Sequence, residues 1–270
     1  MNIKLQTVSG KSLHPIGIGT WGFGGAWEAD YDNDDEAIAA IRYSIKQGQN
    51  HIDSGQIYGA GHTDEVIGKA IAGVKREDLF ITDKVWETHV GKGKVRIAVK
   101  EILKKLGTDY LDILYIHKPW DNFPWIEAVP QINDLIDKGV VRYFGVSNFK
   151  VEHMEEALKV SKHPIVANQL HYNILYKNEV TEEMITFCKK NRIQIIAYKP
   201  LERGEVLKNK AVQAIAKKHK ASTVKVALAW LAQQDMLAIP KAESKKLIDQ
   251  NIAALGIKLT TEDVERLNNL

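Results

Sequence analysis

The feature of this sequence that most constrains its fold is an eightfold alternation of two patterns. A short apolar run, typical of a buried β-strand, is followed each time by a longer stretch whose apolar residues have helical spacing. The apolar runs span residues 16–20, 51–53, 79–85, 111–117, 143–147, 165–169, 193–198 and 237–241. The helical stretches include residues 34–48, 95–107, 125–139 and 222–234.

Alternation of this kind predicts a parallel sheet, because the helix between two strands returns the chain to the edge where the next strand begins. Eight such units within 270 residues favour a closed α/β structure, the (β/α)₈ TIM barrel, over an open doubly wound sheet. We expect residues 1–270 to form a single domain with an N-terminal β-hairpin, made by residues 3–8, a turn at 9–11 and a return through Leu13.

Three stretches lack the repeating pattern, and each follows a predicted strand. They are residues 22–33, 118–124 and 200–209. Segments that follow the strands of a barrel lie at its C-terminal face, where the active sites of such barrels are built. We therefore expect these three loops to surround the functional site.

Composition argues against several classes of function. The net charge is only +3, from 37 basic and 34 acidic residues that are scattered along the chain, so it gives no reason to expect a nucleic-acid partner. The first residues lack the apolar core of a signal peptide, and no apolar run approaches membrane-spanning length. We expect a cytoplasmic protein with no membrane partner, either a monomer or a small homo-oligomer.

The single cysteine, Cys188, cannot form an internal disulfide, which fits a reducing compartment. It falls in the helical stretch 181–190, so we interpret it as a packed thiol and not as a nucleophile.

A glycine motif near the N-terminus matches the G-x-G-x-x-G fingerprint of dinucleotide binding over residues 17–22. That fingerprint works when a helix begins at the glycines and points its N-terminus at the pyrophosphate. Here Gly24, Gly25 and a polar stretch follow, and no helical pattern begins before about Asn33. We interpret the motif as a barrel strand followed by a glycine-rich loop.

Four polar side chains, Asp53, Tyr58, Lys84 and His117, stand at or just past the ends of strand-like runs. Neighbouring strands lie about 5 Å apart, so the ends of the second, third and fourth strands can converge within roughly 10 Å. A lysine ammonium beside a phenol lowers a pKa that starts near 10, and Asp53 would keep the lysine charged. Tyr58 would then protonate a carbonyl oxygen to which a neutral His117 donates a hydrogen bond.

Each of these residues alone has an ordinary structural explanation, as a helix cap, a solvated charge, a core ring or a hydrogen-bonded core histidine. Together they favour a functional site, because Lys84 and His117 end apolar runs, where a charge is costly without a partner. The pattern predicts a carbonyl reductase.

The sequence resembles the aldo-keto reductase family over nearly its whole length. The resemblance implies an NAD(P)H-dependent barrel whose catalytic tetrad is Asp53, Tyr58, Lys84 and His117, with Tyr58 as the acid in reduction and the base in oxidation. It also implies small carbonyl or alcohol substrates and no metal. The matching segments are GIGTWG (17–22), HIDSGQIYG (51–59), TDKVW (82–86), IHKP (116–119), GVSNF (145–149), ANQ (167–169), AYKPL (197–201) and IPK (239–241).

The resemblance further implies a cofactor site around the tetrad. Ser147, Asn148 and Gln169 match residues that bind the nicotinamide carboxamide, and Tyr198 matches the ring that stacks on the nicotinamide. Others would contact the phosphates and adenine. The predicted cofactor-binding residues are Gly19, Thr20, Trp21, Asp53, Ser147, Asn148, Gln169, Tyr198, Pro200, Leu201, Gly204, Ile239, Lys241 and Asn251.

The sequence departs from the family pattern where a 2′-phosphate would bind. Ala242 follows Lys241, and Leu247 stands where the family usually has an arginine. Lys245 or Lys246 would replace the missing contacts as point charges, without the forked geometry of arginine. We therefore expect NADP(H) to be only slightly favoured and NAD(H) to be usable as well.

The predicted substrate-binding residues are Trp21, Trp86, His117 and Lys118, and Trp120 would help to line the same apolar pocket. Lys118 stands where the family usually has tryptophan, and its charge would favour carbonyl compounds that carry a carboxylate. The sequence ends at Leu270, so we expect no long C-terminal loop over the pocket and an open, permissive site.

Two alternatives stay open. Lys84 at a strand end would suit a Schiff-base aldolase, although a neighbouring Asp53 opposes the loss of the lysine proton that this chemistry needs. The same fold would also suit a non-catalytic, nucleotide-binding sensor subunit.

Overall fold

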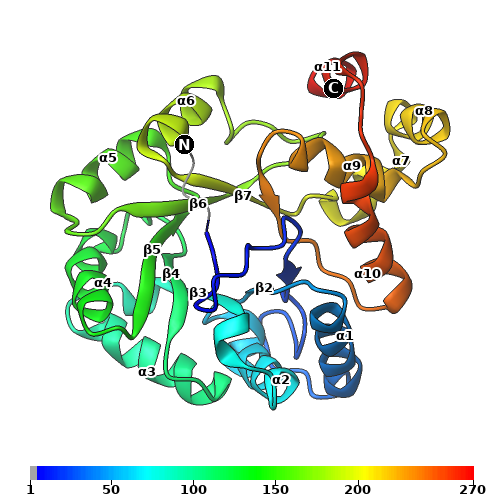
Figure 1. The fold of residues 1–270 in the computed structure, drawn as a ribbon. Helices are drawn as coiled ribbons and strands as arrows, with labels where there is room; N and C mark the ends of the chain where they lie inside the picture. Colours follow the sequence, from blue (N-terminus) through cyan, green and yellow to red (C-terminus); the bar gives the residue numbers. More distant parts are fainter. Residues whose placement is uncertain (1–4) are drawn as a thin grey trace.

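The computed structural model describes residues 5–270 and confirms the (β/α)₈ barrel (Figure 1). Eight strands form one sheet in sequence order, and every neighbouring pair is parallel. A parallel bridge between Ile16 and Ala238 joins the last strand to the first and closes the ring. The strands are β1 (Ile18–Gly19), β2 (His51–Asp53), β3 (Phe80–Val85), β4 (Leu111–Ile116), β5 (Val141–Ser147), β6 (Ile165–His171), β7 (Gln194–Tyr198) and β8 (Leu237–Ala238).

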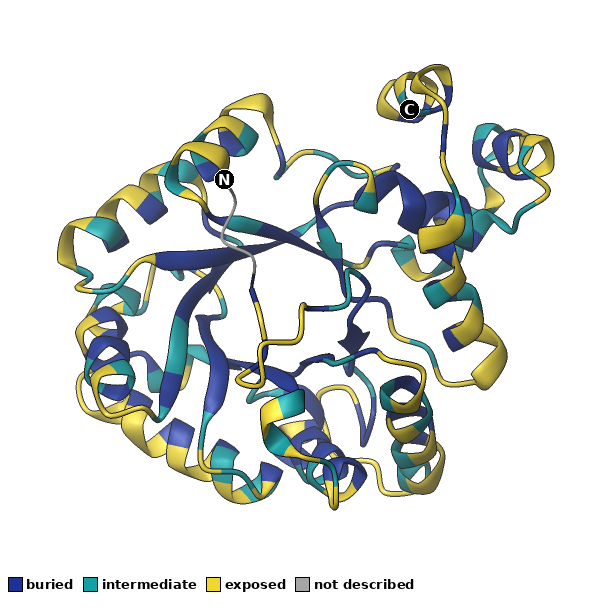
Figure 2. Cartoon of the chain, in the orientation of Figure 1, coloured by how far each residue is buried: buried dark blue, intermediate teal, exposed yellow. Residues whose placement is uncertain are grey.

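Helices surround the sheet, with buried faces toward the strands and exposed faces outward (Figure 2). They are α1 (Asp34–Lys46), α2 (His62–Ile71), α3 (Lys94–Leu106), α4 (Ala128–Asp137), α5 (Val151–Val160), α6 (Glu182–Asn191), α7 (Glu205–Lys208), α8 (Lys210–Lys218), α9 (Thr223–Ala232), α10 (Lys245–Ile252) and α11 (Thr261–Asn268). Each predicted helical stretch matches a helix that begins and ends within about three residues of the predicted bounds, namely α1, α3, α4, α6 or α9.

The segment 200–209, predicted to be a loop, contains a 3₁₀ turn (Glu202–Gly204) and the four-residue helix α7. The prediction is wrong here because a single helical turn is too short to show a hydrophobic period. Val206 is the one buried residue of α7, and its burial holds the turn in place.

The first and last strands are shorter than predicted, because β1 and β8 have two residues each. The pairing nevertheless continues past the regular ladder, since the Gly19 amide donates to the Pro240 carbonyl at 3.2 Å. A Cβ atom at Gly19 would lie 2.4 Å from the Ile239 carbonyl oxygen, so the two backbones approach closely only because residue 19 is glycine. The glycine motif therefore closes a barrel, and between residues 5 and 33 no helix begins.

The core has two layers. One lies between the sheet and the helices, and the other fills the barrel interior with side chains such as Phe80, Ile113 and Tyr115. Leu5 and Leu13 belong to the interior layer, so the N-terminal segment crosses the barrel axis, as Figure 1 shows. The predicted hairpin is reduced to one antiparallel bridge, Gln6 to Ser12, and its first residues, Ile3 and Lys4, lie outside the described residues.

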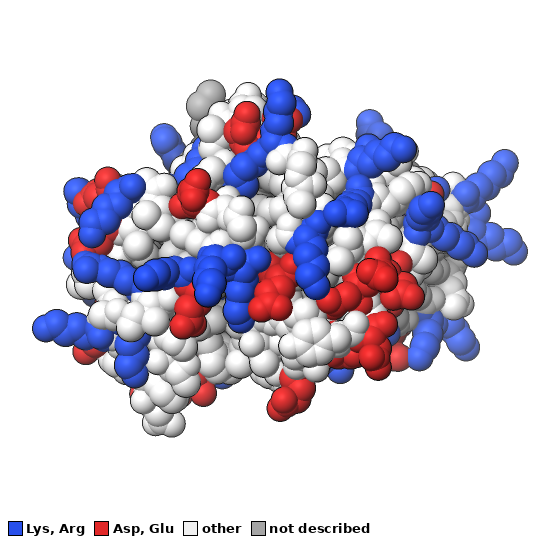
Figure 3. Space-filling view, turned by 90° about the horizontal axis from the view of Figure 1, so that it is seen from below, with Lys and Arg blue, Asp and Glu red and all other residues white. Residues whose placement is uncertain are grey.

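Other expectations from composition can be compared with the structure. Cys188 is buried and its thiol contacts the Met184 sulfur at 3.7 Å, which confirms a packed thiol. Basic and acidic side chains share the face drawn in Figure 3. Within residues 5–270, no helix combines the length and the apolarity needed to cross a membrane.

A buried carboxylate fastens the N-terminal end of the barrel. Asp112 on β4 is fully buried and pairs with Arg76 at 2.8 Å and with Arg142 at 2.5 Å. The same carboxylate accepts the Ile81 amide at 2.8 Å. It therefore joins three segments at the end of the barrel where the strands begin, opposite their C-terminal ends.

We predict that Asp112→Ala lowers the free energy of unfolding by about 2–3 kcal/mol, since it leaves charged donors and a backbone amide without their buried acceptor. The measurement is urea denaturation with an unchanged m-value. Asp137→Ala is the matched control, because Asp137 is exposed and pairs with Lys162 and His163 at the surface. It should change stability by no more than about 0.5 kcal/mol, and equal losses in the two variants would contradict the prediction.

Candidate active site

The loop after β2 brings Tyr58 back toward the strands. Beyond Asp53 the backbone stays beside β3, since the Gln56 amide donates to the Lys84 carbonyl at 3.1 Å. A tight turn then follows, in which the Tyr58 amide donates to the Gly55 carbonyl at 2.8 Å. Gly59 has a positive φ of 53°, and a Cβ there would lie 2.3 Å from the Gly24 carbonyl oxygen. Tyr58 is thus held between its own loop and the glycine-rich loop after β1.

The Lys84 ammonium is the centre of the site. It is fully buried and donates to three oxygens: Asp53 Oδ2 at 2.7 Å, the Ser54 carbonyl at 2.5 Å and Tyr58 Oη at 3.1 Å. An ammonium has three N–H donors and no acceptor, so these bonds use its whole capacity. Its position and its charge are both fixed by the surrounding oxygens.

The Asp53 carboxylate is held equally firmly. Its second oxygen accepts from Thr82 Oγ1 at 2.9 Å and from Gln169 Nε2 at 2.7 Å. Both oxygens therefore have donors in the part of the chain that the structure describes. A buried carboxylate bonded in this way stays in place as the counter-ion of Lys84.

His117 lies across the pocket from the other three residues. Its ring centroid is 6.0 Å from that of Tyr58 and 5.0 Å from that of Trp86. Its Nδ1 atom is buried and has no partner among residues 5–270. Burial, with a smaller effect of the Lys84 charge, lowers the pKa of His117 well below its ordinary value, so the ring is neutral and can donate through only one nitrogen.

The charge of Lys84 and the burial of Tyr58 shift the pKa of the Tyr58 phenol in opposite directions. Burial raises the pKa of Tyr58, and the Lys84 charge and hydrogen bond lower it. The net pKa of Tyr58 is raised, so the lysine effect expected from the sequence is present but smaller than desolvation. Burial lowers the pKa of Lys84, but Asp53 and Tyr58 outweigh it and raise that pKa above its ordinary value.

Polar residues predicted to hold a nicotinamide lie beside the tetrad at the ends of β5, β6 and β7. Ser147 Oγ donates to the Gln169 carbonyl at 2.9 Å, and Asn148 Nδ2 donates to the His117 carbonyl at 2.9 Å. Tyr198 Oη donates to Asn148 Oδ1 at 2.8 Å. Asn148 has φ +60°, a conformation that asparagine tolerates better than most residues. The Gln169 amide likewise bonds within the protein, to Asp53 Oδ1 at 2.7 Å, and the predicted contacts of these residues with a carboxamide stay predictions.

The ring of Tyr198 stacks on a neighbouring aromatic side chain. His171 lies 5.3 Å away at an interplanar angle of 20°, and Tyr176 stacks on His171 with centroids 3.9 Å apart. The Lys199 ammonium also lies 5.8 Å from the centroid of the Tyr198 ring. The His171 ring also pairs with Glu202 at 2.5 Å, which fastens the loop after β7 to β6.

That loop carries the predicted residues Pro200, Leu201 and Gly204, and its backbone is unusual. Glu202 and Arg203 have positive φ values of 43° and 50°. The Glu202 carboxylate accepts from Asn173 Nδ2 at 2.7 Å as well as pairing with His171. The sequence analysis missed His171, Asn173 and Glu202, because single polar residues past a strand end carry no periodic signal.

The residues predicted for the phosphates and adenine lie where β8 meets β1. Thr20 Oγ1 donates to the Asp53 carbonyl at 2.8 Å, and Asn251 on α10 is buried. The Lys241 ammonium forms an ion pair with Glu243 and lies 5.1 Å from the centroid of the Phe23 ring. Lys241 is therefore partly neutralised by its own neighbour.

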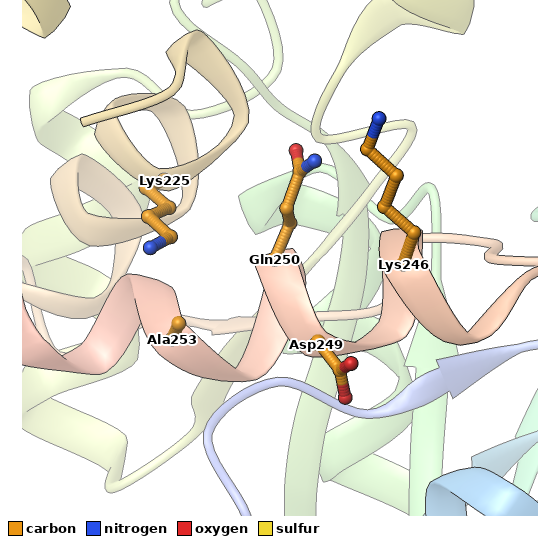
Figure 4. Close-up of a pocket in the computed structure, with 5 residues that line it drawn as sticks. All are labelled: Lys225, Lys246, Asp249, Gln250 and Ala253. Atoms are coloured by element: carbon orange, nitrogen blue, oxygen red, sulfur yellow. The ribbon is translucent and has the colours of Figure 1, made fainter.

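The lysines proposed to replace an arginine differ in their surroundings. Lys245 lies 5.5 Å from the centroid of the Tyr43 ring. Lys246 lines a surface pocket between α9 and α10, together with Lys225, Asp249, Gln250 and Ala253 (Figure 4). Figure 4 shows Lys246 and Gln250 on one side of α10 and Asp249 on the other. Of the two lysines, Lys246 is the one that faces an open pocket.

Tryptophans surround the tetrad. Trp21 packs edge-on against Tyr58 with centroids 4.8 Å apart, and Trp120 lies 5.3 Å from Trp86. Trp27 was missed by the sequence analysis; it is 60% exposed and lies 4.8 Å from Trp21. An aromatic residue within a polar, glycine-rich loop after a strand is the signal that could have identified it. Lys118 is exposed, and its predicted contact with substrate stays a prediction.

Comparison with known proteins agrees with this geometry. A model of the Aldo/keto reductase family matches residues 15–270. A glyoxal reductase of Bacillus subtilis is 33% identical over 241 residues, which cover 88% of this chain and 85% of that protein. A methylglyoxal reductase of Escherichia coli is 32% identical over 277 residues, which cover 99% of this chain and 95% of that protein.

Solved structures show the same relationship. A thermostable aldo-keto reductase in complex with the inhibitor epalrestat superposes with a TM-score of 0.92 at 38% identity, covering 100% of this chain and 99% of that one. An aldo/keto reductase of Klebsiella pneumoniae in complex with NADP and acetate gives a TM-score of 0.89 at 29% identity, covering 100% of this chain and 95% of that one. Since the family match extends over nearly all of the barrel and the structures agree along the whole chain, the protein belongs to the aldo/keto reductase family.

Proposed function

We propose that this protein reduces aldehydes and ketones to alcohols, reversibly, with NAD(P)H as the hydride donor and Tyr58 as the general acid. The observation that carries the proposal is the three-way contact of the buried Lys84 ammonium with Asp53, Ser54 and Tyr58 Oη. The phenol oxygen satisfies the third N–H donor of the lysine, and the same contact places a positive charge against the phenol. Here the contact favours release of the phenol proton and therefore supports acid catalysis.

The residues present fit a nicotinamide cofactor. The half-buried aromatic ring of Tyr198 suits stacking with a planar ring, and the polar edge formed by Ser147 and Asn148 suits a carboxamide. The chemistry that the cofactor supplies when bound is hydride donation to the carbonyl carbon. The 6.0 Å between the ring centroids of Tyr58 and His117 supports a carbonyl oxygen that contacts both side chains.

The protein's own contribution is to the oxygen of the substrate. As negative charge develops on that oxygen, Tyr58 gives it the phenol proton, and Lys84 stabilises the phenolate that remains. Neutral His117 donates a hydrogen bond that orients the carbonyl. In the direction of alcohol oxidation, the Tyr58 phenolate takes the proton back. Trp21 and Trp86 pack edge-on against the Tyr58 and His117 rings that make these contacts.

NADP(H) is the cofactor that we propose, with a modest preference over NAD(H). The Klebsiella pneumoniae relative in complex with NADP supports it. In this chain the candidate groups for a 2′-phosphate are Lys241, which is paired with Glu243, and Lys246 beside the open pocket of Figure 4. Because lysine is a point charge without the fork of arginine, the preference should be smaller than an arginine would give.

The substrates that we propose are small carbonyl compounds. The similarity to glyoxal and methylglyoxal reductases supports this class. A cytoplasmic location is also part of the proposal, supported by a single cysteine that is buried as a thiol. A Schiff-base aldolase is not supported, because the raised pKa of Lys84 opposes the loss of the proton that such chemistry requires.

We predict that Tyr58→Phe lowers kcat for reduction of an aldehyde at least about a hundredfold, since it removes the general acid. Turnover is followed by the absorbance of NADPH or NADH with a panel of aldehydes, ketones and keto acids. Binding of NADPH, measured by quenching of tryptophan fluorescence, should change by less than about twofold, which is well under 1 kcal/mol. Tyr110→Phe, whose hydroxyl bonds the Arg76 carbonyl far from the site, is the control. Turnover like that of the wild type in Tyr58→Phe would refute the mechanism.

Lys246→Ala tests the cofactor preference. We expect KM for NADPH to rise about five- to tenfold and KM for NADH to stay nearly constant, because only NADPH carries the additional phosphate. The rise should shrink at high salt, which screens an exposed charge. Lys162→Ala, an exposed lysine paired with Asp137, is the control. Equal changes for the two cofactors would show that Lys246 does not contact the 2′-phosphate.

A further inference from the structure

Two carboxyl groups without an assigned role are buried directly behind the tetrad. Asp64 on α2 and Asp83 on β3 are 1% and 0% exposed. Successive side chains of a strand point to opposite faces, so Asp83 points away from the barrel interior that Lys84 enters, toward the helices. On that side it lies close enough to Asp64 for the charge of Asp64 to raise the pKa of Asp83. Two acidic side chains are thus buried as neighbours behind the tetrad.

Each carboxyl group uses its other oxygen to hold a part of the catalytic site. Asp64 Oδ1 accepts from Ser54 Oγ at 2.6 Å, and Asp83 Oδ1 accepts from the Lys84 amide at 2.6 Å. The Oδ2 atoms of both are buried and have no hydrogen-bond partner among residues 5–270, so each is open to a shared proton. Two carboxylates can make a hydrogen bond only if a proton lies between them, and two like charges in contact are strongly disfavoured when buried.

Few other charges act on this pair. The charged groups that face it are the Lys84 ammonium on β3 and Lys105 on α3. Burial raises the pKa of Asp64 to about 6 and, helped by the charge of Asp64, raises the pKa of Asp83 well above its ordinary value. The two cations are therefore not sufficient to keep both carboxyl groups ionised at neutral pH.

The pair is connected to the catalytic lysine by two short routes. Ser54, whose side chain bonds Asp64, also supplies the carbonyl that accepts from Lys84 Nζ at 2.5 Å. Asp83 bonds the main chain of Lys84 itself. The backbone of the lysine and one of its three acceptors are thus both tied to the same pair of carboxyl groups.

We propose that Asp64 and Asp83 share one proton and act as positioning residues, which hold Ser54 and the Lys84 backbone so that the ammonium stays against Tyr58. Loss of the shared proton at high pH would leave both carboxyl groups negatively charged, and their repulsion would move them apart. Ser54 would then no longer be held where its carbonyl accepts from the Lys84 ammonium. The kinetic consequence rests on the proposed function, whereas the shared proton does not.

Stability as a function of pH provides the first test. Groups whose pKa is raised by folding stabilise the folded state fully only below their unfolded pKa, near 4, and that stabilisation is lost as pH rises through the folded values. Asp83→Asn cannot titrate, and its amide can donate to Asp64 without a shared proton. The Tm of Asp83→Asn relative to the wild type should therefore rise between about pH 5 and about pH 9. A difference that does not change with pH would overturn the proposal.

Infrared spectroscopy tests the proton directly, without any need for activity. A buried, protonated carboxyl group gives its own C=O stretching band, and this band should be present in the wild type at neutral pH and absent in Asp83→Asn. A wild type without it would overturn the proposal, even if the protein reduces carbonyl compounds. A band that disappears in Asp83→Asn would support the shared proton, even if no carbonyl substrate were turned over.

Kinetics test the positioning role. We expect Asp64→Ala to lower kcat at least about tenfold and Asp64→Asn, which can still accept from Ser54, to restore most of it. In Asp83→Asn the alkaline limb of the kcat profile should move up by about one pH unit. Asp112→Asn, a buried carboxylate at the other end of the barrel, should lower Tm and leave the shape of the profile unchanged. The positioning role would be overturned if the alkaline limb of the kcat profile did not move in Asp83→Asn. It would also be overturned if the limb moved equally in Asp112→Asn.

Discussion

The site depends on one constraint, which is that a charged lysine is kept inside a protein core. Lys84 is fully buried, and an unpaired ammonium at such a depth would lose its proton or destabilise the fold. Asp53 supplies the opposite charge, and the Ser54 carbonyl and Tyr58 Oη accept hydrogen bonds from the remaining N–H groups of Lys84. The same bonds that satisfy the lysine hold the phenol against a positive charge. Stability and chemistry therefore use the same contacts.

The barrel makes this arrangement possible because its parallel strands end together. β2 delivers Asp53, β3 delivers Lys84, and His117 follows β4 directly. Tyr58 alone comes from a loop, and that loop is fixed by a backbone approach that only glycine at position 59 allows. The further strand ends, of β5 to β7, add the polar edge and the ring suited to a nicotinamide. The site is therefore assembled from side chains at the C-terminal ends of neighbouring strands.

Much of this could be predicted from the sequence, because alternation of strands and helices is a repeated signal. The barrel, its strand order and the approach of Lys84 to Asp53 and Tyr58 follow from apolar runs and their last residues. Single-turn features such as α7 were missed, since four residues carry no period. The bond from Gln169 to Asp53 joins residues 116 positions apart, and no local pattern reports it.

The pKa shifts of the buried groups were harder to predict than the positions of the residues. The sequence indicates that Lys84 lowers the pKa of Tyr58, but only the structure shows that burial outweighs this effect. In the same way Asp64 and Asp83 are ordinary acidic residues in the sequence, and only the structure shows that both are buried and that each affects the pKa of the other. Chemistry that depends on desolvation cannot be inferred before the packing is known.

The central claim is that the Lys84 charge holds the Tyr58 phenol pKa below the value that burial alone would give. Carbon NMR of protein labelled at the tyrosine Cζ atom measures this pKa directly, with Tyr58→Phe to assign the signal. The account predicts that the Tyr58 phenol titrates at a higher pH in Lys84→Met than in the wild type. An equal or lower titration pH in Lys84→Met would contradict it.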